Sequence, residues 1–561
     1  MVVNPHAVEL TMLVVLAAWS VPGLLTRRRR SYAGKWIAPF ASRRWLVVAA
    51  IGLASLSIRA ALLPIHPVPA PAVMDEYSYL LAGDTFASGR LVNPSHPCWI
   101  HFETLCEIVQ PTYASKYPPG QGLVLALGIL LLRNPWAGVW LSVGAMCAAM
   151  VWMLQGWLPP RWALLGGVLI LVRTGLSSYW VDTYWGGAVA ATGGALVWGA
   201  LPRLLRRGGI GASLAMGTGL AILANSRPFE GLLAAAPAMA ALAGWVLRRR
   251  WASLRTLAPM VGVLALTAVA MAVYNQAVTG SFWRMPYQLH EAQYAAAPLF
   301  VFQKMRPAPI YHHASMAGVW NGTAVEEYLL TFRMGLVRAS LFKLSRVWDF
   351  FLGPILTVPM LCLPWALRNK RLRLVYLALA FFLAGTLAVI DVLPHYAAPG
   401  MALIYLALVQ CLRHLRAGRP LARAASRAIP AVLVATVALL YGLEILGADF
   451  LHEHYSWCFA RPGNWERVRI ARQLEAMPGQ HLVLVRYGPQ HDPRREWVYN
   501  AADIDASRVV WAREMDADHN RTLLAYFPSR RVWLLEPDDP NPQVRPCPAA
   551  ETTSALRTRT P

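Results

Sequence analysis

The sequence predicts a polytopic α-helical membrane protein that ends in a small soluble α/β domain. Of its 561 residues, 56% are hydrophobic and 14% are charged, whereas soluble chains carry about a quarter charged residues. The apolar residues also lie in long runs, such as WLVVAAIGLASLSIRAALL from Trp45. Because roughly 20 mainly apolar residues are needed to cross a bilayer, we expect about 12 transmembrane helices.

The placement of the basic residues predicts the orientation of these helices. The net charge is +23, and the charges gather in clusters that separate the apolar runs. This is the positive-inside pattern of cytoplasmic loops next to anionic lipid headgroups, so we expect a membrane-lipid partner and no nucleic acid. The clusters are RRRR at 27–30, RLLRR at 203–207, RRRWASLR at 248–255, RNKRLR at 368–373 and RHLRAGR at 413–419.

With these clusters on the cytoplasmic side, both termini lie outside. Residues 1–44 then hold an additional N-terminal span and a basic cytoplasmic segment, and RRRR follows this span instead of preceding it, unlike a cleaved signal peptide. The stretch 120–132 is too short to cross, so we expect a re-entrant or interfacial helix there. The expected spans are 6–25, 45–65, 136–157, 162–178, 187–202, 210–225, 229–247, 256–277, 350–367, 374–391, 396–412 and 429–447.

The transmembrane domain at 45–447 thus has a first external loop at 66–135 and a second at 278–349. The tail that follows differs in composition. HLVLVRY, SRVVWA and RVWLLE are typical of short strands, and WERVRIARQLEAM is typical of an amphipathic helix. We expect a soluble extracytoplasmic α/β domain at 448–540 and a Pro-rich disordered tail at 541–561.

Four of the seven cysteines fall in the expected external regions: Cys98, Cys106, Cys458 and Cys547. An oxidising compartment permits disulfides there, and Cys98–Cys106 is the nearest pair in sequence. Four free thiols are an almost equal alternative. No CxxC motif and no zinc-ligand spacing is present.

Charged residues suited to chemistry gather at the external ends of the spans. Charged groups beside a membrane are costly, and they mark candidate functional positions. Asp75 and Glu76 follow the second span, and Asp75 lies one helical turn before Tyr79. The other candidates are Lys116 and Tyr117 before a Pro-Pro step, Asp182 in the next external turn, Arg227 and Glu230 in SRPFEG, and His395 and Tyr396 in the last membrane turn.

Each candidate also has a structural interpretation. Asp182 alone is more often half of an ion pair or a solvated turn residue than a catalyst. The structural interpretation of Arg227 and Glu230 is a salt bridge between them. That of His395 and Tyr396 is an anchor at the membrane–water interface. The loop pair His312 and His313 lacks a third metal ligand. Several acids with an Arg and a Lys on one face, however, match group transfer from a phosphorylated lipid, which needs a base and cations.

Over residues 45–412, the order of these motifs resembles the GT-C superfamily of membrane glycosyltransferases. The shared features are the acidic pair after an early span, YPPG at 117–120 before a short apolar helix, and a second-loop Asp. SRPFEG at 226–231 and YNQAVTGSFWRMPY at 274–287 follow. The most similar groups are protein O-mannosyltransferases, the lipid A aminoarabinose transferase and lipopolysaccharide-core galacturonosyltransferases.

The resemblance implies an inverting glycosyltransferase with a polyprenyl-phosphate sugar donor and a lipid, polysaccharide or protein acceptor. It implies a location in the bacterial inner membrane, with the active site and the tail facing the periplasm. Asp75 would be the general base, Glu76 its assistant or a ligand of a divalent cation, and Asp182 a further site acid. No other cofactor is implied. The donor-phosphate and substrate-binding residues would be Lys116, Tyr117, Arg227, Glu230, His395 and Tyr396.

A transporter or flippase of a polyprenyl-linked glycan is the alternative function. Such a protein would place ionisable residues in mid-span, where its helices are interrupted. Here the candidates lie at the external ends instead, and Arg173 is the nearest to a mid-span charge. The sequence therefore favours the enzyme, while the sugar, the acceptor, the carrier length and any metal dependence stay open.

Overall fold

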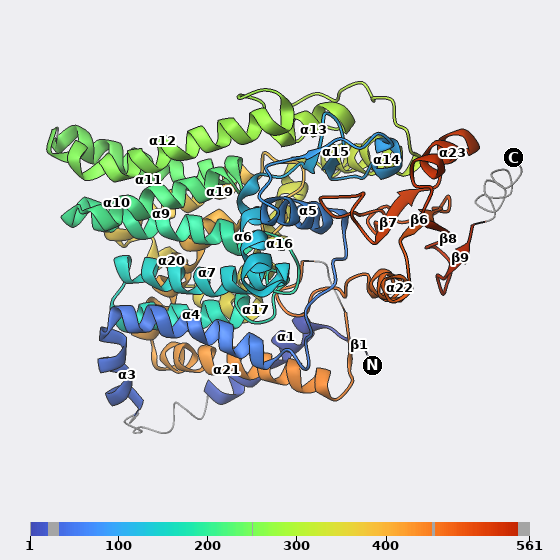
Figure 1. Ribbon diagram of the computed structural model, residues 1–561. Coiled ribbons are helices and arrows are strands. Elements are labelled where there is room, and N and C mark those ends of the chain that lie inside the picture. Colours follow the sequence, from blue (N-terminus) through green and yellow to red (C-terminus); the bar gives the residue numbers. More distant parts are fainter. Residues whose placement is uncertain (1, 21–32, 250, 452–454, 548–561) are drawn as a thin grey trace, which may run out of the picture.

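A helical bundle and a small α/β domain make up the computed structural model, which describes residues 2–20, 33–249, 251–451 and 455–547 (Figure 1). Seven of the described helices are long and apolar enough to cross a membrane. They are α4 (Arg44–Ala61), α7 (Pro135–Trp157), α9 (Gly187–Arg207), α11 (Pro228–Arg249), α12 (Trp251–Thr279), α20 (Met401–Ala417) and α21 (Pro420–Ile445). The predicted fold class, a multi-pass helical membrane protein with a small α/β domain, is confirmed. The predicted number of spans is not.

Shorter helices complete the bundle. They are α1 (Pro5–Ser20), α3 (Ala33–Ser42), α6 (Pro119–Leu132), α8 (Pro160–Thr174), α10 (Ile210–Ala224) and α19 (Arg373–Thr386). Small residues let some of them approach closely: a Cβ on Gly219 of α10 would lie 2.8 Å from the carbonyl oxygen of Gly193 in α9. The predicted re-entrant stretch is the helix α6. The basic cluster at 27–30 lies outside the described residues.

The prediction of one span at 350–367 is wrong. Helix α16 (Leu336–Phe351) ends there, and two short helices follow, α17 (Gly353–Met360) and α18 (Leu363–Ala366). Gly353 has a positive φ of 57°, which breaks the helix after Phe351. Pro359 and Pro364 lack the N–H group that a continuous helix would use, so the chain turns again between α17 and α18.

The two large loops contain helices and short strands that lie at the tail-domain end of the bundle. The first loop holds α5 (Met74–Ala87) and a three-stranded sheet in the order β2-β4-β3, formed by Asn93–Pro94, Thr112–Ser115 and Glu107–Ile108. The second loop holds α13 (Pro286–Tyr294), α14 (Ala314–Ala317) and α15 (Ala324–Arg333). Cys98 and Cys106 are both free thiols.

The tail forms a four-stranded sheet in the order β7-β6-β8-β9. Its strands are β6 (His481–Val485), β7 (Val509–Arg513), β8 (Arg531–Leu535) and β9 (Val544–Pro546), and its helices are α22 (Trp465–Ala476) and α23 (Ala517–Tyr526). The three predicted strands and the predicted helix are confirmed. Disorder from residue 541 is wrong, because β9 pairs antiparallel with β8. Residues 548–561 lie outside the described part.

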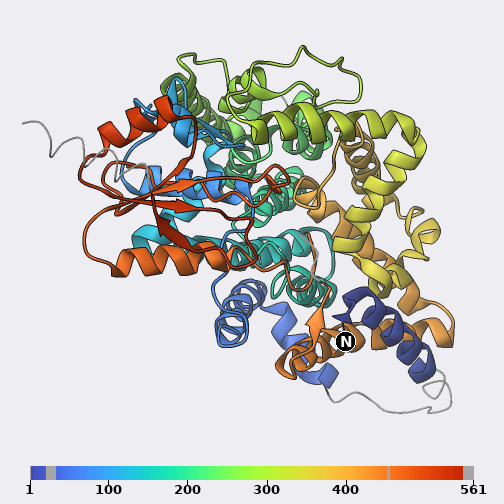
Figure 2. The ribbon, with the colours of Figure 1, turned by 90° about the vertical axis from the view of Figure 1, so that its right-hand side faces the viewer.

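The tail domain packs against the first loop and covers one end of the bundle (Figures 1 and 2). Leu81, Phe102 and Tyr113 of the first loop share a buried apolar cluster with Leu482 and Leu523 of the tail. At the opposite side of the tail, β1 (Val2–Val3) pairs in parallel with β5 (Asp449–Phe450). The described N-terminal residues and the start of the tail are thereby held together.

Candidate active site

Asp75 lies in a partly buried polar cluster at the start of α5. The Tyr117 hydroxyl donates a hydrogen bond to Asp75 Oδ1, and the Cys106 Sγ lies 3.7 Å from the same oxygen. The ring of Tyr117 stacks on that of Tyr79, with 4.4 Å between the centroids. The packing of α5 on the segment before α6 therefore brings together Asp75, Tyr79 and Tyr117, which the sequence places in two separate motifs.

Glu76 faces away from this cluster, although it follows Asp75 directly. Its side chain is 1% exposed, and Oε1 accepts from the backbone N–H groups of Ala72 and Val73 at 3.0 and 3.3 Å. Oε2 accepts from the N–H of Tyr184 at 3.1 Å. Burial raises the pKa of Glu76 to about 7, although these hydrogen bonds lower it. Both carboxylate oxygens thus accept hydrogen bonds from backbone N–H groups, and Glu76 caps the start of α5.

Lys116 is buried among aromatic rings beside Asp75. Its side chain is 5% exposed, and Nζ lies 4.8 Å from the ring centroid of Trp320, 5.2 Å from that of Tyr117 and 5.9 Å from that of Tyr287. Burial lowers the pKa of Lys116, but Cys106, Asp75 and Glu291 together raise it above its ordinary value. The ammonium group therefore keeps its charge in a largely dry position.

Arg227 is the second cation of the cluster. It precedes α11, and its guanidinium lies 4.2 Å from the ring centroid of Tyr396. Glu230 is 7% exposed, and among the ion pairs of the described residues none joins it to Arg227. The structural interpretation of these two residues as a salt bridge therefore does not hold, and Arg227 is held by an aromatic face.

His395 lies next to Tyr396 in the turn after α19. It is fully buried, its Nδ1 is 2.9 Å from the Tyr179 hydroxyl, and the Trp185 ring lies 4.3 Å away. Burial lowers the pKa of His395 well below its ordinary value, and the charge of Arg227 lowers it further. His395 is therefore a neutral imidazole at pH 7, so it can donate a hydrogen bond to a phosphate but cannot supply a positive charge.

Asp182 is paired with Arg59 of α4 rather than with the other candidates. Arg59 Nη2 lies 2.9 Å from Asp182 Oδ1, and Nη1 donates to the His66 carbonyl at 2.9 Å. Burial raises the pKa of Asp182, and the Arg59 charge acts in the opposite direction. The structure thus favours the interpretation of Asp182 as half of an ion pair.

Sequence reasoning missed Glu291 and gave Tyr287 no role. Both lie on α13, one turn apart, and Glu291 is 7% exposed with the charge of Lys116 acting on it. Burial raises the pKa of Glu291, and Lys116 counters this effect. The signal for α13 was present, since Pro286 at the first helical position predicts a helix start. Spacing of four residues would then have placed Tyr287 and Glu291 on one face.

No metal ligand set is evident. Among the residues that the structure describes, no group of three or more His, Cys, Asp and Glu side chains has the geometry to hold a metal ion. Glu103 does supply a carboxylate to His312 at 3.1 Å, but as a hydrogen-bonding partner. Both oxygens of Glu76 already accept hydrogen bonds from backbone N–H groups, so Glu76 does not share a cation with Asp75 in this arrangement.

An apolar groove of about 730 Å³ runs between α6, α7, α9, α10 and α12. One end is formed by Pro119, Gly120 and Asn225, which lie within three residues of Tyr117 and Arg227. The Gly120 N–H donates to the Asn225 carbonyl at 2.7 Å, which joins the two segments. The groove wall and the polar cluster therefore share two segments of chain, 117–120 and 225–227. Most of the groove wall is apolar, including Leu123, Val124, Leu127, Leu141, Ile222, Val263 and Leu266.

Comparison with known proteins finds no matching family model and no matching curated protein. Solved structures similar to the chain include ArnT from Cupriavidus metallidurans in the apo state, at 13% identity and a TM-score of 0.49 over 94% of this chain and 95% of that one. The same protein bound to undecaprenyl phosphate gives 14% identity and a TM-score of 0.48 over 92% and 95%.

A third similar structure is the oligosaccharyltransferase AglB from Archaeoglobus fulgidus in complex with an inhibitory peptide and a dolichol-phosphate. It has 11% identity and a TM-score of 0.41 over 89% of this chain and 70% of that one. ArnT and AglB are GT-C glycosyltransferases, the superfamily that the motifs resemble. At these identities and TM-scores, the similarity adds no support to the roles of individual residues.

Proposed function

We propose that the chain is a glycosyltransferase that moves a sugar from a polyprenyl-phosphate donor to a hydroxyl of an envelope lipid, polysaccharide or protein. The observation that carries this proposal is that Asp75 and Lys116 both contact Tyr117, while Arg227 lies over Tyr396 and interacts electrostatically with Tyr79 and Tyr117. An apolar groove lined by Pro119, Gly120 and Asn225 lies on the same two segments of chain. A carboxylate, two cations and an apolar channel are what transfer from a lipid phosphate requires.

In this reaction Asp75 acts as general base. The Tyr117 hydroxyl occupies Oδ1, and Oδ2 is left to accept the proton of the attacking hydroxyl. The acceptor oxygen forms a bond to the anomeric carbon as the bond from that carbon to the donor phosphate breaks. The phosphate leaves with an additional negative charge, which Lys116 and Arg227 stabilise as it develops. A single displacement of this kind inverts the anomeric centre.

The groove has an orienting role for the isoprenoid chain of the donor. Lipid tails are as apolar as the groove wall, so burial there brings little hydrophobic free energy beyond that of the bilayer. In the proposal the wall instead fixes the direction of the chain, and the donor phosphate leaves the groove past Gly120 and Asn225, which belong to the same segments as Lys116 and Arg227. Positioning of this kind lowers the entropic part of the barrier.

The remaining candidates receive supporting roles in the proposal. Glu76 caps the helix that carries Asp75, and Asp182 neutralises Arg59 at the end of α4. His395 offers an N–H group to the donor, since its Nε2 has no hydrogen-bond partner in the described structure. Tyr396 holds the Arg227 guanidinium over its ring, and Glu230 lies in the first turn of α11 behind it.

The test is a mass-spectrometric comparison of envelope glycans and glycolipids in a deletion strain. We expect one sugar to disappear on deletion, to return with the wild-type chain, and to be reduced by about 100-fold or more with Asp75→Asn, because a general base contributes on this scale. Asp518→Asn, the same change at an 85% exposed position in the tail, should restore the sugar fully. Equal restoration by Asp75→Asn would contradict the assigned base and favour the flippase.

A further inference from the structure

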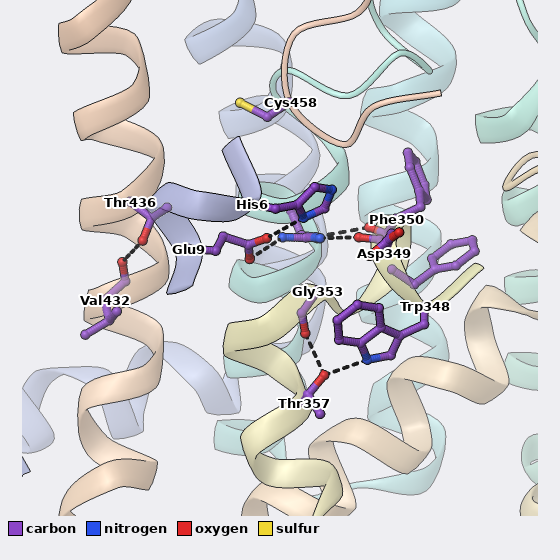
Figure 3. Close-up of polar contacts among 12 residues, drawn as sticks. His6, Glu9, Trp348, Asp349, Phe350, Gly353, Thr357, Val432, Thr436 and Cys458 are labelled. Carbon is purple, nitrogen blue, oxygen red and sulfur yellow. Dashed lines mark hydrogen bonds and ion pairs between the residues drawn. The ribbon is translucent and has the colours of Figure 1, made fainter. Parts of the chain in front are cut away.

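A buried ion pair joins the N-terminal helix α1 to the end of α8. Glu9 and Arg173 are both fully buried, and Arg173 Nη1 donates to Glu9 Oε1 at 2.7 Å (Figure 3). Removing two charges from water is costly, and removing one partner of a buried pair is more costly still, because it leaves an uncompensated buried charge. The reaction proposed above does not use this pair.

Arg173 contacts two further segments besides α1. Its Nε donates to the Phe350 carbonyl at 3.0 Å, and Nη2 donates to the Asp349 carbonyl, both in the last turn of α16. Its guanidinium also lies 3.8 Å from the ring centroid of Trp457, at the start of the tail. One side chain thus links α8 with α1, α16 and the tail.

Gly353 lies beside this arrangement (Figure 3), and its lack of a side chain leaves the space that the ion pair needs. A Cβ at this position would lie 2.5 Å from Arg173 Nη2 and 2.7 Å from Glu9 Oε2. Its φ of 57° is also one that other residues rarely adopt. The break between α16 and α17 therefore serves the ion pair directly.

The turn at 175–186 follows Arg173 and leads to the candidate site. It is fixed to the tail by a hydrogen bond from the Tyr179 N–H to the Ser456 carbonyl at 3.0 Å. The Tyr179 hydroxyl bonds His395 at 2.9 Å, and the Tyr184 N–H bonds the Glu76 carboxylate at 3.1 Å. The turn thereby contacts the histidine beside Tyr396 and the cap of the helix that carries Asp75.

The end of α16 gives a second connection to the same site. Arg346 of α16 lies 2.5 Å from Asp391, which belongs to the turn that carries His395 and Tyr396. Arg173 holds the carbonyl groups of Asp349 and Phe350, less than two helical turns further along α16. The Glu9–Arg173 pair is therefore connected to the site from two directions.

We propose that Glu9 is a positioning residue for the transfer reaction. Its carboxylate neutralises and orients Arg173, and Arg173 fixes the turn at 175–186 and the end of α16 in the arrangement that holds the polar cluster together. The helix α1, which precedes the transferase-like region, thus affects catalysis without contacting substrate. The effect on rate rests on the proposed function, whereas the effect on the turn does not.

The experiment is hydrogen–deuterium exchange of the full-length protein in lipid nanodiscs, combined with glycan analysis of the complemented deletion strain. In Glu9→Gln we expect amides at 177–184 to exchange about tenfold faster, because local opening becomes less costly. Amides of α10 should be unchanged. Product should fall about tenfold, since misplaced catalytic groups slow the reaction, while binding of undecaprenyl phosphate, measured by native mass spectrometry, is retained.

Thr436→Val is the matched control. Thr436 is fully buried and its hydroxyl donates to the Val432 carbonyl of its own helix at 2.8 Å (Figure 3). This variant should leave exchange and product at wild-type levels. A loss of exchange protection at 177–184 of the same size in Thr436→Val would overturn the proposal, because it would show a general loss of packing.

Two other results would also overturn it. The first is that amides at 177–184 exchange at the wild-type rate in Glu9→Gln. The second is that these amides exchange faster in Glu9→Gln but the amount of product stays at the wild-type level, although Asp75→Asn lowers it in the same strain.

If Glu9→Gln does not accumulate, the double variant Glu9→Gln/Arg173→Gln is measured in its place, because it removes the unpaired charge as well. Faster exchange at 177–184 in this double variant supports the proposal, and wild-type exchange contradicts it. Absence of any glycan change on deletion would refute the transferase alone.

Discussion

Asp75 and Glu76 are neighbours in the chain, yet the fold gives their carboxyl groups opposite environments. Asp75 faces a tyrosine hydroxyl, a thiol and a buried lysine. Glu76 faces three backbone N–H groups and is almost fully buried. The first arrangement suits proton transfer, and the second suits a helix cap.

The raised pKa of Glu76 makes a prediction about stability and pH. A folded pKa of about 7, against 4.5 for the free group, means that folding favours the protonated form. Glu76 therefore contributes stability below pH 4.5 that is lost as the pH rises through 7, by roughly 3 kcal/mol in total. Gln has no such titration.

Thermal unfolding of the wild type and of Glu76→Gln between pH 5 and pH 8.5 checks this. We expect the advantage of the wild type over Glu76→Gln to be largest at pH 5 and to shrink towards pH 8.5. A difference that stays constant with pH, or that grows as the pH rises, would contradict the assigned environment of Glu76.

Side-chain identity and position in the sequence were enough to propose Asp75, Lys116 and Tyr117 as candidates, which the structure brings together. Lys116 and Arg227 lie in turns beside apolar helices, and Asp75 lies in the first turn of α5. Charged residues are costly in such locations, which a sequence displays directly. The direction of the Glu76 side chain and the neutral state of His395 depend on packing by Tyr184 and by Tyr179 with Trp185. These partners lie more than a hundred residues away, so no local pattern contains them.

At the scale of elements, the contact between α6 and the turn before α11 sets the distance between the two cations. Gly120 in the first turn of α6 touches the Asn225 backbone, and a Cβ there would lie 2.6 Å from the Asn225 carbonyl oxygen. Lys116 precedes Gly120 by four residues, and Arg227 follows Asn225 by two residues. Only a glycine lets the two segments approach this closely.

Gly120→Ala should therefore push the two segments apart. We expect a loss of stability of about 1–3 kcal/mol and a fall in product of about tenfold in the complemented deletion strain. Gly244→Ala, in α11 with no atom within 4 Å of the added Cβ, should keep full product and gain about 0.5–1 kcal/mol. Equal product in the two variants would show that the spacing of the cations is not critical.

Elements with a strong period were predictable, and interrupted ones were not. The alternation in HLVLVRY and the long apolar run of α12 each predict one structure. The stretch at 350–367 is as apolar as a span, but Gly353 and its proline residues break it around Arg173. A hydropathy pattern does not contain that reason, because the charged partner lies in α8 and α1.

At the scale of the whole molecule, the first loop, the second loop and the tail meet at Glu103. The Tyr294 hydroxyl donates to Glu103 Oε1 at 2.8 Å, and Arg513 of β7 donates to the Glu103 carbonyl at 2.6 Å. Arg513 also pairs with Glu496 at 2.7 Å, with both side chains 3% exposed. The tail is therefore joined to both loops by a buried polar network.

We propose that two cations hold the donor phosphate and that Asp75 performs the chemistry. Native mass spectrometry with undecaprenyl phosphate tests it on the full-length protein. We expect the wild type and Asp75→Asn to bind this lipid equally. Lys116→Gln and Arg227→Gln should each bind it about tenfold more weakly, because each loses a charge-assisted contact. Equal binding by all four proteins, or loss of binding in Asp75→Asn alone, would contradict the proposal.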